Sequence, residues 1–431
     1  MGNYSREEIL QLVEEEDVEF IRLQFTDMFG VIKNIAVTAR ELPRALDNRC
    51  SVDWMLVTGN TADDESELWL HPDLNTFAIL PWRPQQGKVA RFLCDLYCPD
   101  GTPYENSTRY ILEKNVKEAQ KEGYTCYVDP ECEFFLFHTD DNGIPTTVTH
   151  EQAGYLDVSP LDLGENARRD MVLTLEDMGM EIESSHHEKA PAQHEIDFRY
   201  GKIQRMADSI MTFKMAVRTV AKRHGLHATF MPKPRSEVNG SGMHLKFSLL
   251  KDGEYVFETQ KNTGRISDAA LYFAGGLLAH SREMALVTNP LVNSYKRLVP
   301  GYGAPTELSW TENNQESLVR ILVSGEEETR VELRSPDPSA NPYLVLAVCL
   351  AAGLDGIKNR TKPKKAGEAD SMDCLPETLK EAIELFEKSE WVSKVLGESF
   401  CQTYVESKKQ EWLRYTRQVS DWEREEYLYR L

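Results

Sequence analysis

Apolar and polar residues alternate over several short runs in the first hundred residues, which predicts strands. The run FIRLQF at 20–25 alternates in this way, and a second run at 31–37 follows it after the turn TDMFG. Two alternating runs joined by such a turn predict a β-hairpin. A further strand is predicted at 91–97. Ser5 and Glu8 form an S-x-x-E capping box ahead of the hairpin, which predicts a short amino-terminal helix.

The pattern changes after the segment CPDGTPYENS at 98–107, whose proline and glycine residues indicate a boundary. The stretch 108–123 has helical periodicity, and beyond it strand patterns alternate with long helical ones. After Pro342 the chain is mainly helical in pattern. We therefore expect an α+β protein with a small β-rich domain at 1–103 and a large α+β domain at 104–431.

Composition and charge narrow the classes of function. The chain has 431 residues, enough for two or three domains, and 70 Asp and Glu against 49 Lys and Arg give a net charge of -21. This excess opposes a role in binding nucleic acid or anionic membranes, because phosphate contacts need clustered cations. Neither a membrane span nor a signal-peptide pattern is found, and the eight cysteines include no C-x-x-C. We expect a cytoplasmic protein without a disulfide framework or zinc site.

Four predicted strands carry ionisable side chains where an ordinary strand carries valine or threonine. Side chains at i and i+2 share one face of a strand. The resulting groups are Glu131 with Glu133; Gln193 with Glu195 and Asp197; His244 with Lys246 and Ser248; and Arg330 with Glu332 and Arg334. Like-charged carboxylates repel when they are partly buried, unless a cation lies between them. A solvated sheet face would explain one such strand, but four in one domain favour a cation site.

The candidate metal ligands form an oxygen-rich set with one imidazole, namely Glu131, Glu133, Glu188, Glu195, His244 and Glu332. Hard divalent ions such as Mg²⁺ or Mn²⁺ prefer this mixture of ligands. Because the set contains five carboxylates, two or three ions are needed to approach charge balance. Sites with several such ions typically serve phosphoryl transfer, which makes ATP a candidate co-substrate.

The chain has no P-loop motif, and its two G-x-G segments lack the third glycine of a dinucleotide-binding loop. Metal ions and arginines would therefore have to hold the phosphates. Four arginines are candidates through bidentate hydrogen bonding, namely Arg297, Arg320, Arg330 and Arg334. Taken singly, each of them is more simply explained as a partner in a surface ion pair.

Several long motifs match one known family. The segments ECEFF, HHEKAPAQHEIDF, KPRSEVNGSGMH, NPLVNSYKRLVPGY and RVELRSPDPSANPYL, in this order, resemble the type I glutamine synthetases of bacteria. The resemblance runs through most of the chain. It implies an amino-terminal β-grasp domain joined to a catalytic domain with a curved antiparallel sheet and flanking helices. It also implies a homo-oligomer, a dodecamer of two stacked six-membered rings, with each active site between neighbouring subunits.

The resemblance also implies a role for each candidate residue. Glu131, Glu188 and Glu195 would hold one metal ion, and Glu133, His244 and Glu332 the other. Asn239, Gly240, Arg297 and Arg334 would bind L-glutamate, whereas Glu183, Ser248, Arg320 and Arg330 would lie along the nucleotide. Asp53 would offer its carboxylate to the ammonium site of a neighbouring subunit, and with Arg320 and Arg330 it completes the candidate catalytic set.

The implied reaction has two steps: the γ-carboxylate of glutamate attacks the γ-phosphate of ATP, and an amine then displaces phosphate from γ-glutamyl phosphate. Several residues depart from the family pattern, among them Gly303, Gln315 and Lys246. Gly303 stands where the family has an acidic flap residue, and Gln315 stands where it has an arginine that meets the transferring phosphate. Lys246, on the face of His244, is a candidate for partial compensation of that arginine.

These departures leave three hypotheses open. The first is ATP-dependent ligation of ammonia to glutamate. The second is γ-glutamylation of a bulkier amine that fills the space beside Gly303. The third is a catalytically impaired homologue that serves as a regulator, although such a protein has no physical need for clustered carboxylates.

Overall fold

The computed structural model describes residues 4–55, 67–83, 86–258, 266–313, 315, 317–323, 329–365 and 374–431. The amino-terminal part is built on a six-stranded sheet in the order β2-β1-β6-β4-β3, with β5 paired to β6. β1 is antiparallel to β2 and parallel to β6. The elements of this part are α1 (Arg6–Glu15), β1 (Val18–Thr26), β2 (Ile32–Thr38), α2 (Leu42–Leu46), β3 (Cys50–Asp53), β4 (Glu67–Pro72), β5 (Ala78–Ile79) and β6 (Lys88–Tyr97).

The large part is organised around a ten-stranded sheet in the order β14-β15-β16-β12-β7-β9-β8. β10 and β11 also pair with β7, and β13 pairs with β12. All of its pairings are antiparallel except that of β14 with β15. The strands are β7 (Tyr124–His138), β8 (Ile182–His187), β9 (Gln193–Phe198), β10 (Gly201–Lys202), β11 (Leu226–Thr229), β12 (Met243–Lys251), β13 (Glu254–Tyr255), β14 (Trp310–Glu312), β15 (Val319–Leu322) and β16 (Arg330–Leu333).

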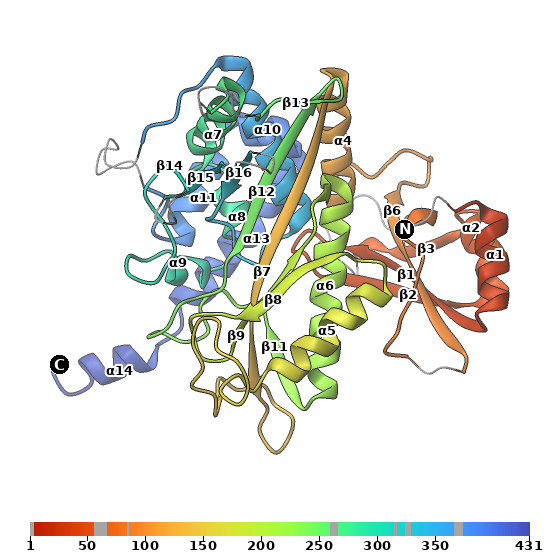
Figure 1. Cartoon of the computed structure of the whole chain (residues 1–431), viewed down its shortest axis with the longest axis horizontal. Helices are drawn as coiled ribbons and strands as arrows, with labels where there is room; N and C mark the ends of the chain where they lie inside the picture. Colours follow the sequence, from red (N-terminus) through yellow and green to blue (C-terminus); the bar gives the residue numbers. More distant parts are fainter. Residues whose placement is uncertain are drawn as a thin grey trace.

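Helices cover one face of this sheet, and α4 and α6 lie on its side toward the small domain (Figure 1). α10 packs against α4, α6 and α7. The helices are α4 (Thr108–Lys121), α5 (Glu165–Asp177), α6 (Ile203–Arg223), α7 (Asp268–His280), α8 (Ala285–Thr288), α9 (Ser294–Arg297), α10 (Pro342–Asn359), α11 (Leu379–Glu387), α12 (Glu390–Leu396), α13 (Glu398–Thr416) and α14 (Asp421–Tyr427). No helix in these ranges is long and apolar enough to cross a bilayer.

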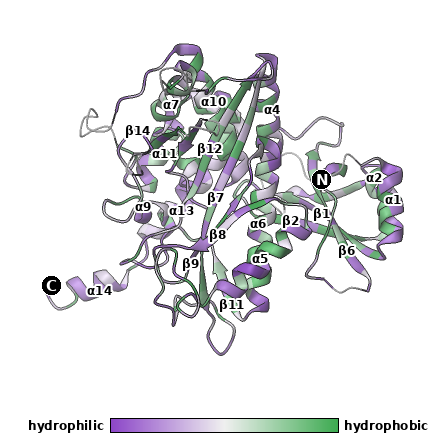
Figure 2. Cartoon of the chain, in the orientation of Figure 1, coloured by the Kyte–Doolittle hydropathy of each residue, from purple (hydrophilic) through white to green (hydrophobic). Residues whose placement is uncertain are grey.

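The helix-covered face carries the apolar half of each alternating strand. Cys132, Phe134, Leu245, Phe247 and Leu333 are all fully buried in the main core. Their ionisable neighbours therefore lie on the opposite face, as the alternation predicts. Figure 2 shows hydrophobic colour over parts of the sheet and of the helices packed against it, and hydrophilic colour over α14.

The predicted elements are confirmed, and their limits differ from the predicted ones by only a few residues. The hairpin of β1 and β2 forms in the predicted place, and the capping box of Ser5 and Glu8 begins α1. Pro342 occupies the first turn of α10, where its missing N–H is not needed. The segment between β6 and α4 covers 98–107. We propose that the domain boundary lies within it, between residues 103 and 104.

The turn between β1 and β2 attaches the small domain to the large one. The side chain of Asn341, which caps α10, donates a hydrogen bond to the carbonyl of Asp27 at 3.1 Å. Gly30 has φ of +77°, and a Cβ at this position would lie 3.1 Å from the Cα of Asn341. Phe29 stacks on Tyr404 of α13 with ring centroids 6.2 Å apart. Only a glycine fits this close left-handed turn without strain.

A partly buried arginine forms a second joint between the domains. Arg109 of α4 contacts Asp73 and Asp95 of the small domain, each at 2.6 Å, and Asp208 of α6 at 3.0 Å. Because three carboxylates from separate elements share one guanidinium, the joint fixes the small domain against α4 and α6.

Candidate active site

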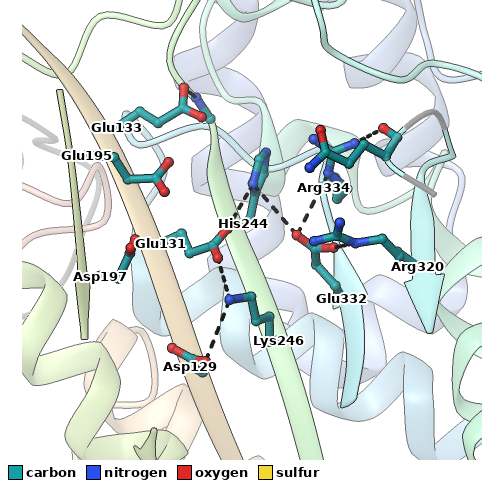
Figure 3. A network of polar contacts seen from close by, with 12 residues as sticks. Asp129, Glu131, Glu133, Glu195, Asp197, His244, Lys246, Arg320, Glu332 and Arg334 are labelled. Carbon is teal, nitrogen blue, oxygen red and sulfur yellow. Dashed lines mark hydrogen bonds and ion pairs between the residues drawn. The ribbon is translucent and has the colours of Figure 1, made fainter. Parts of the chain in front are cut away.

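The register of the large sheet brings the ionisable strand faces together. His244 lies opposite Glu131 across the pair of β12 with β7, and Glu133 lies opposite Glu195 across β7 and β9. On the other side of β12, Glu332 of β16 lies opposite both Lys246 and Arg320. Figure 3 shows these side chains projecting from neighbouring strands toward one another. Four strands predicted separately thus form one acidic surface.

A cavity of about 270 Å³ opens on this surface. Most of the predicted site residues line it, namely Glu131, Glu133, Glu188, Glu195, Asn239, Gly240, His244, Arg297, Arg320 and Arg334, together with Gly303 and Gln315. Glu332 is fully buried beside them. Of the described residues with predicted roles, Asp53, Glu183, Ser248 and Arg330 are outside the lining; Asp53 belongs to β3 of the small domain. The roles predicted for the lining residues and for these four residues all stay predictions.

Fixed cations compensate one half of the acidic surface. Arg320 donates a hydrogen bond through Nε to Glu332, whose other close neighbours of basic type are His244 and Arg334 at 3.7 and 3.8 Å. His244 Nδ1 lies 3.2 Å from Oε2 of Glu131, and Lys246 contacts Oε1 of the same carboxylate. Burial would raise the pKa of Glu131, but the hydrogen bond from His244 and the charges of His244 and Lys246 lower it.

Asp129 belongs to the same compensated half. It is almost fully buried, and Arg330 donates to its Oδ2 at 2.6 Å. We name Asp129, Glu131 and Glu332 the paired half, because the described residues place a Lys or Arg within 4 Å of each of them.

The other half of the surface lacks such partners. We name Glu133, Glu188, Glu195 and Asp197 the unpaired half, because His186 is the one side chain of basic type that the described residues place within 4 Å of any of them. Burial raises the pKa of Glu133, and the charge of Glu188 raises it further. Burial and four neighbouring carboxylates, Glu133 first among them, hold the pKa of Glu195 well above its ordinary value. Burial and mutual repulsion therefore disfavour the charged form of Glu133 and Glu195, and a bound cation would relieve that repulsion.

The residue types and spacing of the surface fit hard divalent ions. Three groups of ligand atoms each lie within 4.8 Å of one another: Glu131, His244 and Glu332; His186, Glu188 and Glu195; and Glu131, Glu195 and Asp197. Among the described residues, Oε1 of Glu332 and Oδ1 of Asp197 are buried without a hydrogen-bond partner. Oxygen ligands with one or two imidazoles suit Mg²⁺ or Mn²⁺.

Asp129, Asp197 and His186 lie at the surface and have no role among the sequence predictions. Asp197 shares the strand face of Glu195, so its position was predictable, but its proximity to Glu131 depends on the pairing of β9 with β7. His186 lies 3.2 Å from Glu188, and the hydrogen bond between them raises the pKa of His186. In the sequence, His186 could have been identified from the dipeptide HH before Glu188, but this pattern alone is weak evidence for a site residue.

Close backbone packing shapes the opposite wall of the cavity. Arg297 is almost fully buried, and its guanidinium donates to the carbonyls of Ser335 at 2.8 Å and Arg334 at 3.2 Å. A Cβ on Gly240 would lie 2.2 Å from the carbonyl oxygen of Pro232, so only glycine fits there. Gly303 has φ of +79°, and a Cβ on it would lie 3.0 Å from Nδ2 of Asn239. The backbone at Gly303 is therefore unfavourable for the acidic residue of the family pattern.

A second buried polar group lies behind the loop that carries Glu188. Glu151 accepts hydrogen bonds from the backbone N–H groups of Ala192 and of Leu163, and its Oε1 lies 2.7 Å from Nε2 of His187. Nδ1 of His187 lies 2.6 Å from the carbonyl oxygen of Glu188. Because both ring nitrogens face acceptors, the imidazolium form satisfies them best. Burial would lower the pKa of His187, but its bond and charge interaction with Glu151 raise it.

This second group already contains a cation. Arg168 lies 2.8 Å from Oδ2 of Asp162 and 2.8 Å from Nδ1 of His194. A guanidinium thus occupies the space between these side chains, although Glu151, Asp162, His187 and His194 have the spacing of metal ligands. The group supports the Glu188 loop from behind.

The fold and the acidic cavity define an α+β protein with a β-grasp domain and a carboxylate-rich site of the kind that binds divalent cations. The family model described as the β-grasp domain of glutamine synthetase matches residues 17–99, and the one described as its catalytic domain matches residues 105–427. The chain therefore belongs to the glutamine synthetase family, as the resemblance indicated.

Relatives and solved structures agree with this assignment. A glutamine synthetase of Clostridium saccharobutylicum is 52% identical over 99% of both chains, and one of Methanosarcina mazei is 48% identical over 98% of both. A solved structure titled "Apo GmaS without ligand" has a TM-score of 0.87 and 30% identity, and the match covers 97% of this chain and 99% of that one.

Replacement of Glu151 tests the support of the site. We expect Glu151→Ala to lower the free energy of unfolding by about 3 kcal/mol, because it leaves a buried imidazolium and two N–H groups without their acceptor. Thermal or urea denaturation measures the loss. The matched control is Glu181→Ala, whose side chain is 70% exposed, with an expected change within about 0.5 kcal/mol. Equal stability of the two variants would contradict the role of Glu151.

Proposed function

We propose that this protein is an ATP-dependent ligase that joins ammonia to the γ-carboxyl group of L-glutamate. The γ-carboxylate attacks the γ-phosphate of ATP, which gives γ-glutamyl phosphate and ADP. Ammonia then attacks the acyl carbon, phosphate leaves, and the nitrogen loses a proton to give glutamine. This reaction forms a C–N bond at the expense of one phosphoanhydride bond.

The observation that carries the proposal is the unpaired half of the acidic surface, in a chain that matches the glutamine synthetase family over almost its whole length. Glu133, Glu188, Glu195 and Asp197 come from β7, the loop after β8, and β9, so the sheet holds them together despite their repulsion. A cluster of this kind is stable when cations enter it, and phosphoryl transfer from ATP needs such cations.

Mg²⁺ or Mn²⁺, two or three ions to a site, would be held by the predicted ligands. In the division that the resemblance implies, Glu131, Glu188 and Glu195 hold one ion, and Glu133, His244 and Glu332 the other. The 4.8 Å groups of the described residues divide the ligands differently. They place Glu131 with His244 and Glu332 and also with Glu195, and none of them includes Glu133. Bound ions of this class neutralise phosphate oxygens and orient the nucleophile.

The remaining walls would hold the two substrates. Asn239, Gly240, Arg297 and Arg334 would bind glutamate, and the carbonyl contacts of Arg297 keep its guanidinium in a fixed orientation for a carboxylate. Arg320 and Arg330, with Glu183 and Ser248, would lie along ATP. Arg320 and Arg330 each retain further N–H donors beside their carboxylate partners, which are suited to phosphate oxygens.

Completion of the site would involve a second copy of the chain. Asp53 lies on β3 of the small domain, outside the cavity of its own subunit. We propose that it serves the ammonium site of a neighbour in a homo-oligomer, a dodecamer of two six-membered rings, in the cytoplasm. The family membership supports this assembly, and sedimentation measures it.

The two other hypotheses gain no support from the comparisons. The relatives that match over nearly the full chain at 46–52% identity bear the name glutamine synthetase. The described residues also retain all six predicted metal ligands, five of them around one cavity. Ammonia is therefore the acceptor that we propose, in place of a bulkier amine, and catalysis is the role, in place of regulation alone.

Phosphate release from the full chain tests the function. Glutamate, ATP, Mg²⁺ and ammonium chloride are expected to give phosphate and glutamine, with no requirement for a primary amine. Release with an alkylamine or polyamine but not with ammonia would establish the bulky-amine hypothesis. Absence of release with every acceptor would contradict the ligase function.

Replacement of Glu195 tests the cation requirement. We expect Glu195→Gln to lower the rate of phosphate release by at least about 100-fold, because it removes a charge that binds cations at the reacting phosphate. In EDTA the same variant should melt at the same or a higher temperature than the parent, since one like-charge repulsion is gone. Glu181→Gln, an exposed control, should change neither value. An active Glu195→Gln variant would refute the metal assignment.

Replacement of Gly303 tests the wall beside glutamate. Gly303→Ala introduces strain of about 1 kcal/mol and displaces Asn239, so we expect a rise of several-fold in the KM for glutamate. Gly143→Ala is the matched control, because Gly143 has φ of +78° and open space around its Cβ position. Both variants should lose a similar amount of stability, and only the first should change KM. An unchanged KM in Gly303→Ala would exclude this contact from glutamate binding.

A further inference from the structure

Lys246 introduces a fixed positive charge among the proposed metal ligands. It lies on β12 two residues after His244 and shares its strand face, as Figure 3 shows. Its Nζ contacts Oε1 of Glu131 and lies 3.8 Å from Oδ2 of Asp129. The lysine side chain is 17% exposed, so water screens this charge only weakly.

The lysine divides the two oxygens of Glu131 between different partners. Oε1 faces Lys246, whereas Oε2 faces Nδ1 of His244 at 3.2 Å. Oε2 therefore lies on the side of His244 and Glu332, the group whose ligand atoms are within 4.8 Å of one another. A carboxylate held in this way offers one oxygen to an ion and keeps the other on the ammonium group.

Asp129 does not account for the presence of the lysine. Its Oδ2 already receives Nη1 of Arg330 at 2.6 Å, a shorter approach than that of Lys246. The closer contact of Lys246 is with Glu131, a candidate metal ligand. An ammonium group in this position attracts the carboxylates but repels a divalent ion bound beside it.

We propose that Lys246 is a positioning residue that acts as a built-in counter-cation of the acidic surface: it fixes Glu131 as a one-oxygen ligand and weakens divalent-ion binding at that carboxylate. This inference rests on the proposed function, because it presupposes that Glu131 binds an ion. The ammonium group of Lys246 thereby balances part of the negative charge of the carboxylates. The chain therefore depends on divalent ions chiefly at the unpaired half.

Titration of the nucleotide-free full chain with Mn²⁺, followed by calorimetry, tests the proposal. Lys246→Met retains most of the length of the side chain but removes its charge, and we expect the affinity of one Mn²⁺ ion to rise at least about tenfold. Lys246→Arg should bind Mn²⁺ as the parent does. If the substitution acted only through lost packing or local unfolding, the affinity for Mn²⁺ would fall. A rise in that affinity therefore identifies an effect of the charge.

The matched control is Lys88→Met, because Lys88 also pairs with a carboxylate, Glu16 at 2.7 Å, but in the small domain. It should leave Mn²⁺ binding unchanged. Lys246→Gln provides a second neutral variant if the methionine variant is unstable. Unchanged or weaker Mn²⁺ binding in a folded neutral variant would overturn the inference about Lys246. A parent chain that binds no Mn²⁺ would instead refute the proposed metal site itself.

Discussion

Repulsion among carboxylates on one face of the large sheet is the constraint on which the site depends. In the paired half the chain supplies its own cations, with Arg320 on Glu332 and Lys246 on Glu131. In the unpaired half the close partners are His186 and neutral donors, such as the amide of Gln193 at 2.9 Å from Glu133. The two halves therefore differ in their need for external cations, although their residue types are similar. The difference between the two halves arises from the side chains that contact the carboxylates, not from the carboxylates themselves.

The apolar face of the same strands makes this repulsion tolerable. Leu245, Phe247 and Leu333 are fully buried against the helices, and each lies next in sequence to a charged residue of the site. To separate the carboxylates the strands would have to move apart, which would expose this core to water. Burial of apolar side chains contributes about 1.5–3 kcal/mol each, so this core opposes such a separation of the strands. The site is thus organised before any ligand enters it.

Much of this arrangement could be predicted from the sequence, because a strand alternates its faces whatever its partners are. The shared faces of Glu131 with Glu133 and of His244 with Lys246 followed from spacing alone. The pairing of Lys246 with Glu131 did not, since it depends on the register of β12 against β7, which a single sequence does not specify. The support of the Glu188 loop by Glu151 was also missed, because Glu151 lies in an irregular segment without periodicity.

The departures from the family pattern act together on the charge of the cavity. In the pattern that the resemblance implies, Gln315 stands in place of a positive charge at one wall, whereas Lys246 places its charge on β12 beside Glu131. Gly303 stands where the resemblance places an acidic flap residue, and its left-handed backbone, close to Asn239, disfavours a side chain there. Because electrostatic stabilisation depends on where a charge lies, the position of Lys246 determines whether it can stand in for the missing arginine. It contacts Glu131 rather than the side of the cavity lined by Gln315, so it acts on the ligands of the cation and not directly on the substrate wall.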